Sequence, residues 1–141
     1  VGAYVDIWHC DAAGLYSDIA QEGTAGATFL RGYQITDNNG IVNFTTIYPG
    51  WYAGRAVHIH FKIRDALTTN PTQYHFISQF FFDETLTSQV HAQTPYASKG
   101  MRDTTNNTDN IFSNGGSQMI LSVVRDSSIY KATFDIGFAL P

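Results

Sequence analysis

Cysteine, charged residues and long apolar runs are all scarce in this 141-residue sequence. Cys10 is the only cysteine, so the chain cannot form an internal disulfide, and a small buried side chain is its simplest role. Eight basic and twelve acidic residues give a net charge of -4 without a basic run, so the electrostatic footprint of a nucleic-acid or anionic-membrane surface is missing. No apolar run approaches the roughly 20 residues that a membrane helix needs. We therefore expect neither nucleic acid nor membrane among the partners.

Several common catalytic signatures are also missing. The sequence has no Gly-rich phosphate loop, no nucleophile elbow and no Cys-x-x-Cys pair, which excludes the simplest forms of nucleotide, serine-hydrolase and dithiol chemistry. What it does have is 43% hydrophobic and 14% aromatic residues, a composition typical of a compact globular protein. Neither an internal repeat nor a low-complexity tract divides the chain. We expect one domain over residues 1–141.

Short apolar runs bounded by turn residues predict a protein built from strands. The expected strands cover residues 1–10, 28–36, 41–47, 58–63, 74–82, 118–125 and 129–138. The run at 74–82 is apolar on both faces and is therefore expected at the centre of a sheet. Helical periodicity is nearly absent, and only residues 83–97 could hold a short helix, while 98–117 reads as a long polar loop. About seven short strands with frequent turns predict an all-β fold, a β-sandwich with long loops.

One turn is specified clearly by its residues. The sequence Asp37-Asn38-Asn39-Gly40 favours a tight hairpin, because Asn and Gly tolerate the positive φ that such turns require. We therefore expect residues 41–47 to return as a strand beside 28–36.

The stretch from Tyr48 to His60 concentrates the side chains that could bind a metal. His58 and His60 lie in a strand-like run, where alternation puts both on one face, roughly 7 Å apart at the backbone. Upstream, a Pro-Gly turn signal and Gly54 allow the loop to fold Tyr48 and Arg55 over that face. Two imidazoles with nearby phenols suggest a hard, Lewis-acidic metal that accepts phenolate oxygen.

Each of these residues also has an ordinary structural interpretation. His-x-His occurs often by chance in strands, and most of the eight tyrosines are expected to be amphipathic packing residues whose hydroxyl finds a partner. His9, His75 and His91 have no second ligand at metal-binding spacing, so we interpret them as hydrogen-bonded or exposed histidines.

A second motif strengthens the metal-binding interpretation of residues 48–60. Residues 6–17, Asp-Ile-Trp-His-Cys-Asp-Ala-Ala-Gly-Leu-Tyr-Ser, together with 48–60 closely resemble the intradiol ring-cleavage dioxygenases, and in particular their secreted single-domain branch. These enzymes are non-haem iron(III) proteins that open catechols between the two hydroxyl-bearing carbons. The resemblance implies a mixed-sheet β-sandwich that carries the metal site on its loops.

The resemblance also implies roles for individual residues. It assigns one Fe(III) per chain to the ligands Tyr16, Tyr48, His58 and His60, with Tyr48 also accepting a substrate proton. Tyr52 competes with Tyr48, and only the family pattern, in which the ligand directly precedes Pro-Gly, decides for Tyr48. Arg55 and Gln79 match the family's catalytic arginine and a glutamine beside the metal, and the expected substrate contacts are Leu15, Trp51 and Tyr52.

The implied activity is O2-dependent cleavage of catechol-type diols to cis,cis-muconate-type diacids, a step in the catabolism of aromatic compounds. Two other functions use the same residues. A metal-dependent hydrolase could use the histidine pair, and a zinc form would be colourless because Zn(II) has no charge-transfer band with phenolate. A non-catalytic β-sandwich could instead present its tyrosines and tryptophans as a platform for sugars or aromatic ligands, without a stoichiometric metal.

The resemblance to secreted relatives raises three further expectations. Because these relatives are secreted, we expect an extracellular protein. We also expect a monomer, because nothing here resembles the helical dimerisation segment of larger relatives. Because Val1 already lies in a strand-like run, we expect a further strand upstream, with a cysteine that could pair with Cys10. The sequons at Asn43 and Asn106 lend slight support to secretion.

Overall fold

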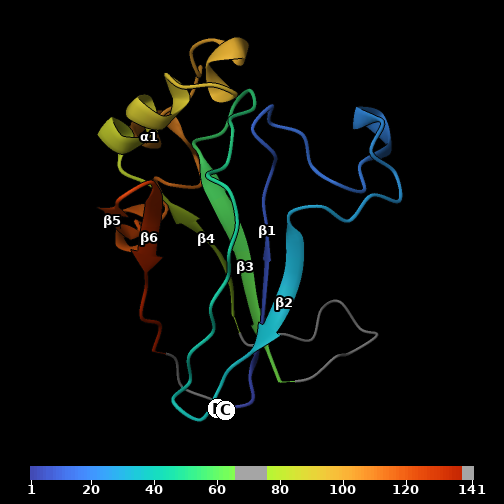
Figure 1. Cartoon of the computed structure of the whole chain (residues 1–141), viewed down its shortest axis with the longest axis vertical. Helices are drawn as coiled ribbons and strands as arrows, with labels where there is room; N and C mark the ends of the chain where they lie inside the picture. Colours follow the sequence, from blue (N-terminus) through green and yellow to red (C-terminus); the bar gives the residue numbers. More distant parts are fainter. Residues whose placement is uncertain (66–75, 138–141) are drawn as a thin grey trace.

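The computed structural model describes residues 1–65 and 76–137, which form two antiparallel sheets with little helix (Figure 1). The four-stranded sheet has the order β2-β1-β3-β4, and its strands are β1 (Tyr4–Trp8), β2 (Arg31–Ile35), β3 (His58–Arg64) and β4 (Phe76–Phe81). The second sheet is a hairpin of β5 (Ser122–Asp126) and β6 (Ile129–Thr133). The all-β prediction is confirmed.

Helical structure is confined to one helix and short 3-10 turns. The helix α1 spans Glu84–His91, and Asp83 caps it by accepting a hydrogen bond from the backbone N–H of Leu86 at 2.9 Å. The 3-10 turns are η1 (Ala20–Glu22), η2 (Tyr96–Lys99), η3 (Asn106–Thr108) and η4 (Gly116–Met119). The short helix expected within residues 83–97 is confirmed. Figure 1 shows α1 beyond the end of the sheet where β3 begins, which brings it next to the start of the histidine strand.

The core lies on the face of β3 opposite to its histidines. Ile59, Phe61 and Ile63 alternate along β3 and are buried, and Val57, Ile59 and Phe82 form an apolar cluster. Leu121 and Val123, at the start of the second sheet, pack against that cluster. Because alternate residues of a strand point to opposite faces, this burial leaves His58 and His60 together on the other face.

Three expectations about the strands are wrong. Residues 41–47 form no strand, although the predicted turn before them does form: the Asp37 carboxylate accepts from the backbone N–H groups of Asn39 and Ile41 at 2.8 and 2.9 Å. The chain leaves this turn and runs past the sheet towards its other end, where Thr46 bonds His9 at 2.7 Å (Figure 1). The turn residues specified a local reversal, but not which strand would pair afterwards.

The other two corrections concern β4, which was expected at the centre of a sheet, and the expectation of a mixed sheet. Among the described strands β4 pairs with β3 alone, so it is an edge strand and not a central one. Its Phe80 is covered on the core face by Phe134, with ring centroids 5.0 Å apart, which accounts for the apolar sequence of an edge strand. All described strand pairs are antiparallel, and the one parallel contact is an isolated bridge between Phe81 and Ile120 that connects the two sheets. Residues 66–75, between β3 and β4, lie outside the described residues.

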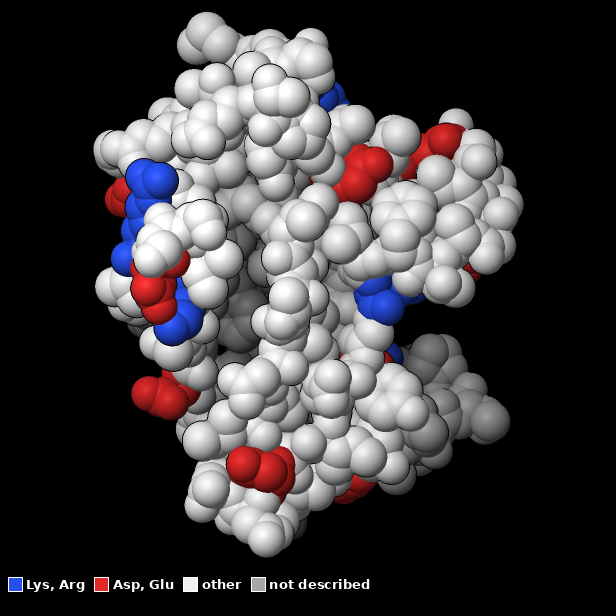
Figure 2. Space-filling view, in the orientation of Figure 1, with Lys and Arg blue, Asp and Glu red and all other residues white. Residues whose placement is uncertain are grey.

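The charged side chains on the face shown in Figure 2 are few and of both signs. Over the β5–β6 hairpin, for example, Lys131 donates to Asp126 at 2.5 Å. No extended basic patch forms on that face. Among the residues described, no helix is long and apolar enough to cross a membrane.

Candidate metal centre

The two histidines of β3 meet at their ring nitrogens. Their Nε2 atoms lie 3.1 Å apart, as the alternation of the strand predicts. His58 is 2% exposed and stands opposite Phe81 of β4, whereas His60 stands between Trp8 of β1 and Gln79 of β4. The indole of Trp8 stacks on the His60 ring, with centroids 4.8 Å apart and parallel planes. Both imidazoles are therefore held by the sheet and not by a mobile loop.

Burial keeps the imidazoles neutral, and a hydrogen bond fixes which nitrogen of His58 carries the proton. His58 Nδ1 lies 2.6 Å from the Ala56 carbonyl oxygen, which can only accept, so Nδ1 carries the proton and Nε2 presents a lone pair. Burial lowers the pKa of His58 to about 4. Burial first, and then the repulsion that a protonated His58 would exert, lower the pKa of His60 to about 3. A pair of neutral imidazoles with converging nitrogens suits a metal ion, which needs deprotonated ligands.

Two phenols complete the cluster, one from each of the loops that the two motifs supply. The hydroxyls of Tyr16 and Tyr52 each lie 3.3 Å from Nε2 of His58, and their rings meet edge to face at 5.6 Å. Asp11 shapes the first loop by accepting from the backbone of Ala13 and Leu15, both at 2.9 Å. Burial raises the pKa of both phenols above the ordinary range for tyrosine. Neither ionises here at neutral pH unless a cation offsets the charge.

Tyr48 does not belong to this cluster, so the structure does not bring this predicted metal ligand and proton acceptor to the histidines. Its hydroxyl lies 2.8 Å from Thr87 Oγ1 on α1, and its ring packs on Phe82 at 4.4 Å. The reason is the Pro49-Gly50 turn, in which the Pro49 carbonyl oxygen lies 3.0 Å from His91 Nε2 and holds the start of the loop towards α1. Four residues later the loop brings Tyr52, expected only as a substrate contact, to the histidines.

The cluster fits a single metal ion. Bonds of about 2.0–2.1 Å from one ion separate neighbouring donor atoms by about 2.8–3.4 Å at angles between 90° and tetrahedral. The contacts of 3.1 and 3.3 Å around His58 Nε2 fall in that range. Among the residues that the structure describes, no group of three or more His, Cys, Asp or Glu side chains could hold a metal. An ion bound here would therefore depend on the phenols, which favour a hard, highly charged cation.

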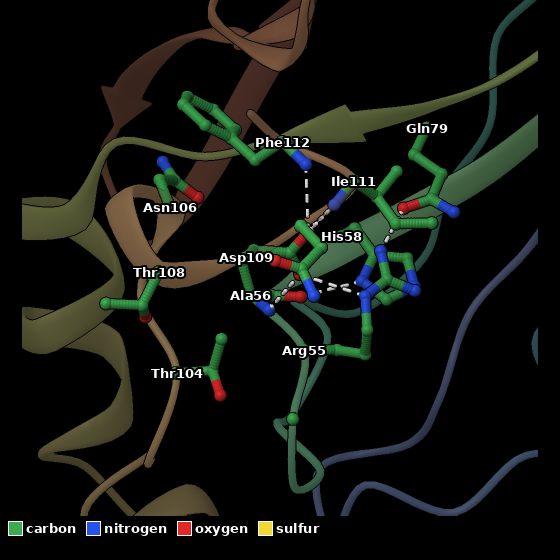
Figure 3. A network of polar contacts seen from close by, with 12 residues as sticks. Arg55, Ala56, His58, Gln79, Thr104, Asn106, Thr108, Asp109, Ile111 and Phe112 are labelled. Atoms are coloured by element: carbon green, nitrogen blue, oxygen red, sulfur yellow. Dashed lines mark hydrogen bonds and ion pairs between the residues drawn. The ribbon is translucent and has the colours of Figure 1, made fainter. Parts of the chain in front are cut away.

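Arg55 connects the cluster to a buried carboxylate that the sequence did not reveal. Its Nε donates to Asp109 at 2.9 Å and its terminal nitrogen donates to Gln79, so the two residues predicted as a catalytic pair are in contact (Figure 3). The side chain of Arg55 is 20% exposed, whereas that of Asp109 is fully buried. The guanidinium is thus held near the histidines, and the Arg55 side chain stays partly exposed.

Asp109 organises the polar network shown in Figure 3. Besides Arg55 it accepts from the backbone N–H groups of Ala56, Ile111 and Phe112 at 2.7, 2.7 and 2.8 Å. Burial alone would raise the pKa of Asp109, but these hydrogen bonds and the Arg55 charge outweigh it and hold the pKa below its usual range. In the sequence Asp109 stands in a polar loop without any periodic pattern, so nothing there distinguished it from surface residues.

The remaining residues that the sequence singled out are Leu15, Trp51 and three histidines. Trp51 packs against the apolar core cluster and donates from Nε1 to Gly100 at 3.2 Å, while Leu15 is 39% exposed. His9 and His91 are buried and hydrogen bonded outside the cluster, as expected, and His75 lies outside the described residues. Leu15 and Trp51 stay predictions as substrate contacts.

Cys10 and the two sequons also find their places. Cys10 is buried with its thiol 3.5 Å from the Gly50 carbonyl oxygen, and burial raises the pKa of the thiol to about 12. Its pairing with an upstream cysteine stays a prediction. Asn106 is buried and donates from its side chain to Phe82 at 2.9 Å, whereas Asn43 is exposed. Of the two sequons, only Asn43 presents its amide to solvent.

Most of this chain is similar to known dioxygenases. The family model described as "Dioxygenase" matches residues 1–111. The chain is 29% identical over 113 residues to a chlorocatechol 1,2-dioxygenase of Pseudomonas putida, covering 67% of this chain and 42% of that protein. It is 36% identical over 101 residues to a catechol 1,2-dioxygenase of Candida albicans, covering 67% of this chain and 32% of that protein. The chain thus spans less than half the length of either curated relative.

A solved structure is similar over nearly the whole chain. An intradiol ring-cleavage dioxygenase from Tetranychus urticae superposes with a TM-score of 0.81 at 31% identity, covering 93% of this chain and 68% of that one. The family match over residues 1–111 includes the strand that carries the histidines and the loops that carry the tyrosines.

Proposed function

The chain belongs to the intradiol ring-cleavage dioxygenases, and we propose on that premise that it uses O2 to open catechol-type diols between their two hydroxylated carbons. The observation that carries the proposal is the convergence of two phenols on two neutral imidazoles, with His58 Nε2 at 3.1 to 3.3 Å from the other three donor atoms. The products would be cis,cis-muconate-type diacids. A role in the catabolism of aromatic compounds follows from this chemistry.

Enzymes of this family generally depend on non-haem iron. We propose that Tyr16, Tyr52, His58 and His60 hold one Fe(III) per chain, with Tyr52 in the role that the family resemblance assigned to Tyr48. Two phenolates would offset most of the ion's charge, and neutral imidazoles would add none. When bound, the ferric ion would supply Lewis acidity that draws electron density from a catecholate and makes its ring reactive towards O2.

The protein's own residues have separate tasks in this proposal. Tyr52 would accept a proton from a substrate hydroxyl, because a tyrosine phenolate, with an ordinary pKa near 10, is a base strong enough to take it. The Arg55 guanidinium would stabilise negative charge on the bound ring. Gln79 and the buried Asp109 hold that guanidinium from two sides, so it is in place before substrate arrives.

Iron analysis and colour provide the first test. We expect about one iron per chain, a visible tyrosinate-to-Fe(III) absorption band, and consumption of one O2 per catechol cleaved, with both oxygen atoms found in the diacid by isotope labelling. His60→Ala serves as the control and should lose iron, band and activity together. A colourless protein that binds zinc would favour the hydrolase alternative, and one that binds no metal would favour the non-catalytic alternative. Either result would refute the proposal.

We also propose that the protein acts outside the cell as a monomer. The proposal is supported by the resemblance of residues 6–17 and 48–60 to secreted relatives and by the exposed sequon at Asn43. Fractionation of cells that produce the protein, with light scattering of the purified protein, tests both points. A protein retained in the cytoplasm, or a dimer at low concentration, would contradict it.

A further inference from the structure

Three segments meet beside the proposed metal centre. The first tyrosine loop is residues 11–16, the second tyrosine loop is residues 48–55, and the third segment is η2. The Nζ of Lys99, at the end of η2, donates to the carbonyl oxygen of Ala13 at 2.5 Å and to that of Trp51 at 2.6 Å. The same ammonium lies 4.9 Å from the ring centroid of Trp51. One cation therefore contacts both loops at once.

The two loops touch each other backbone to backbone. The N–H of Gly50 donates to the Asp11 carbonyl oxygen at 3.0 Å. A Cβ added at Gly14, where φ is 84°, would lie 2.1 Å from the Trp51 carbonyl oxygen, and one added at Gly50 would lie 2.5 Å from the Asp11 carbonyl oxygen. No side chain fits between the loops, so carbonyl groups from both loops crowd together. The negative ends of such dipoles repel unless a donor, preferably a cation, lies between them.

The second tyrosine loop depends on side-chain contacts for its shape. It belongs to no strand, and four successive carbonyl groups, those of Tyr48, Pro49, Gly50 and Trp51, lie within hydrogen-bonding distance of side chains. Those of Tyr48 and Pro49 meet Tyr96 and His91, which bind this loop alone. In the part of the chain that the structure describes, Lys99 is the side chain that donates to the backbone of both tyrosine loops.

We infer that Lys99 is a positioning residue that sets the two phenols of the metal centre relative to each other. Ala13 precedes Tyr16 by three residues and Trp51 directly precedes Tyr52, so a shift at either Lys99 contact moves a phenol. Each phenol hydroxyl lies 3.3 Å from His58 Nε2, and this separation suits a shared ion only while both loops keep their places. Lys99 is not one of the four residues of the cluster, and it acts through the two loops that it contacts. This inference rests on the proposed function, because it concerns the geometry of that site.

The test compares Lys99→Met, which keeps the length of the side chain and loses its donors, with Lys99→Arg. The matched control is Lys131→Met, since Lys131 forms an exposed ion pair with Asp126 on the β5–β6 hairpin. In iron-loaded protein, Lys99→Met should shift the tyrosinate-to-Fe(III) band and accelerate iron loss to a chelator about 10- to 100-fold, the usual effect of losing an outer partner of a metal ligand. Lys99→Arg should retain part of the wild-type behaviour, and Lys131→Met all of it.

A second measurement needs no iron. In metal-free Lys99→Met, amide hydrogen exchange should accelerate in peptides covering 11–16 and 48–55 while the strands of the four-stranded sheet stay protected. Wild-type exchange rates, band position and iron release in Lys99→Met would overturn the inference. If Lys99→Met does not fold, Lys99→Arg decides alone, and a band and release rate identical to wild type would then refute the role. A wild-type protein that takes up no iron and shows no band refutes the proposed function instead, and the exchange experiment still decides whether Lys99 holds the loops.

Discussion

The exchange of roles between Tyr48 and Tyr52 gives a sharp prediction, because the same substitution at these two positions should change different properties: the metal centre at Tyr52 and only the stability at Tyr48. Tyr52→Phe removes a hydroxyl that lies 3.3 Å from His58 Nε2. With one phenol of two left near the histidines, the tyrosinate-to-Fe(III) band should lose roughly half of its intensity and change position. Turnover should fall by more than the 10- to 100-fold that loss of an outer partner causes.

Tyr48→Phe should leave the metal centre unchanged and affect stability alone. It removes a hydroxyl bonded to Thr87 at 2.8 Å, while Thr87 keeps its own hydrogen bond to the Asp83 carbonyl oxygen at 2.9 Å. No buried polar group loses its last partner, so the cost is that of one ordinary hydrogen bond, about 1 kcal/mol. For a chain of this length that corresponds to a decrease in Tm of about 4 °C.

The assay is a visible spectrum, an iron determination and a calorimetric scan on both variants and the wild type, prepared in parallel. The expected pattern is a changed band with Tyr52→Phe, and a normal band with a lower Tm for Tyr48→Phe. A band lost with Tyr48→Phe and kept with Tyr52→Phe would show that the contact with Thr87 does not represent the iron-loaded protein, and would return the ligand role to Tyr48.

Three further predictions concern other parts of the molecule. Arg55→Ala should retain iron yet lose about 10²-fold in turnover, the scale of one preorganised donor, and an unchanged rate would reduce Arg55 to a structural ion pair. In metal-free protein the pKa values of about 4 for His58 and about 3 for His60 lie below the unfolded value near 6.5, so the unfolded chain binds more protons. The two histidines should therefore contribute their whole stabilisation above pH 6.5, and the free energy of unfolding should decrease on acidification towards pH 4, by about 1.4 kcal/mol per pH unit for each histidine. Urea titrations that show no pH dependence would contradict both shifts. Expressed through a eukaryotic secretory pathway, the protein should carry glycan on the exposed Asn43 and none on the buried Asn106. Mass spectrometry of the Asn43→Gln variant checks this expectation. Glycan remaining on that variant would mean that Asn106 is accessible.

Much of the metal centre could be predicted from local sequence because its histidines lie in a strand. Alternation along residues 58–63 put His58 and His60 on one face, and the structure brings their Nε2 atoms to 3.1 Å. The loop that ends at Tyr16 follows the first predicted strand, residues 1–10, and in the structure it follows β1. Each of these features depends on residues within a few positions, for which φ, ψ and side-chain direction follow from regular geometry.

The identity of the second phenol could be decided only by the tertiary structure. Tyr48 and Tyr52 stand in the same irregular loop, where no periodicity fixes the direction of a side chain. Their directions depend on distant partners, since Thr87 and His91 on α1 hold the start of the loop. For the same reason the sequence did not reveal Asp109, whose partner Arg55 is 54 positions away.

Strand pairing shows the same division between local and distant determinants. The Asp37 turn formed as its residues predict, yet residues 41–47 did not pair, and β4 proved to be an edge strand. Apolar content reports that a strand is covered, and it does not report what covers it. The sequence by itself therefore determined the all-β class, the histidine face and the family motifs. Packing between distant segments decided which strands pair, which tyrosine reaches the histidines and which carboxylate holds Arg55, because those contacts depend on hydrogen bonds and buried surface that form only once the chain has folded.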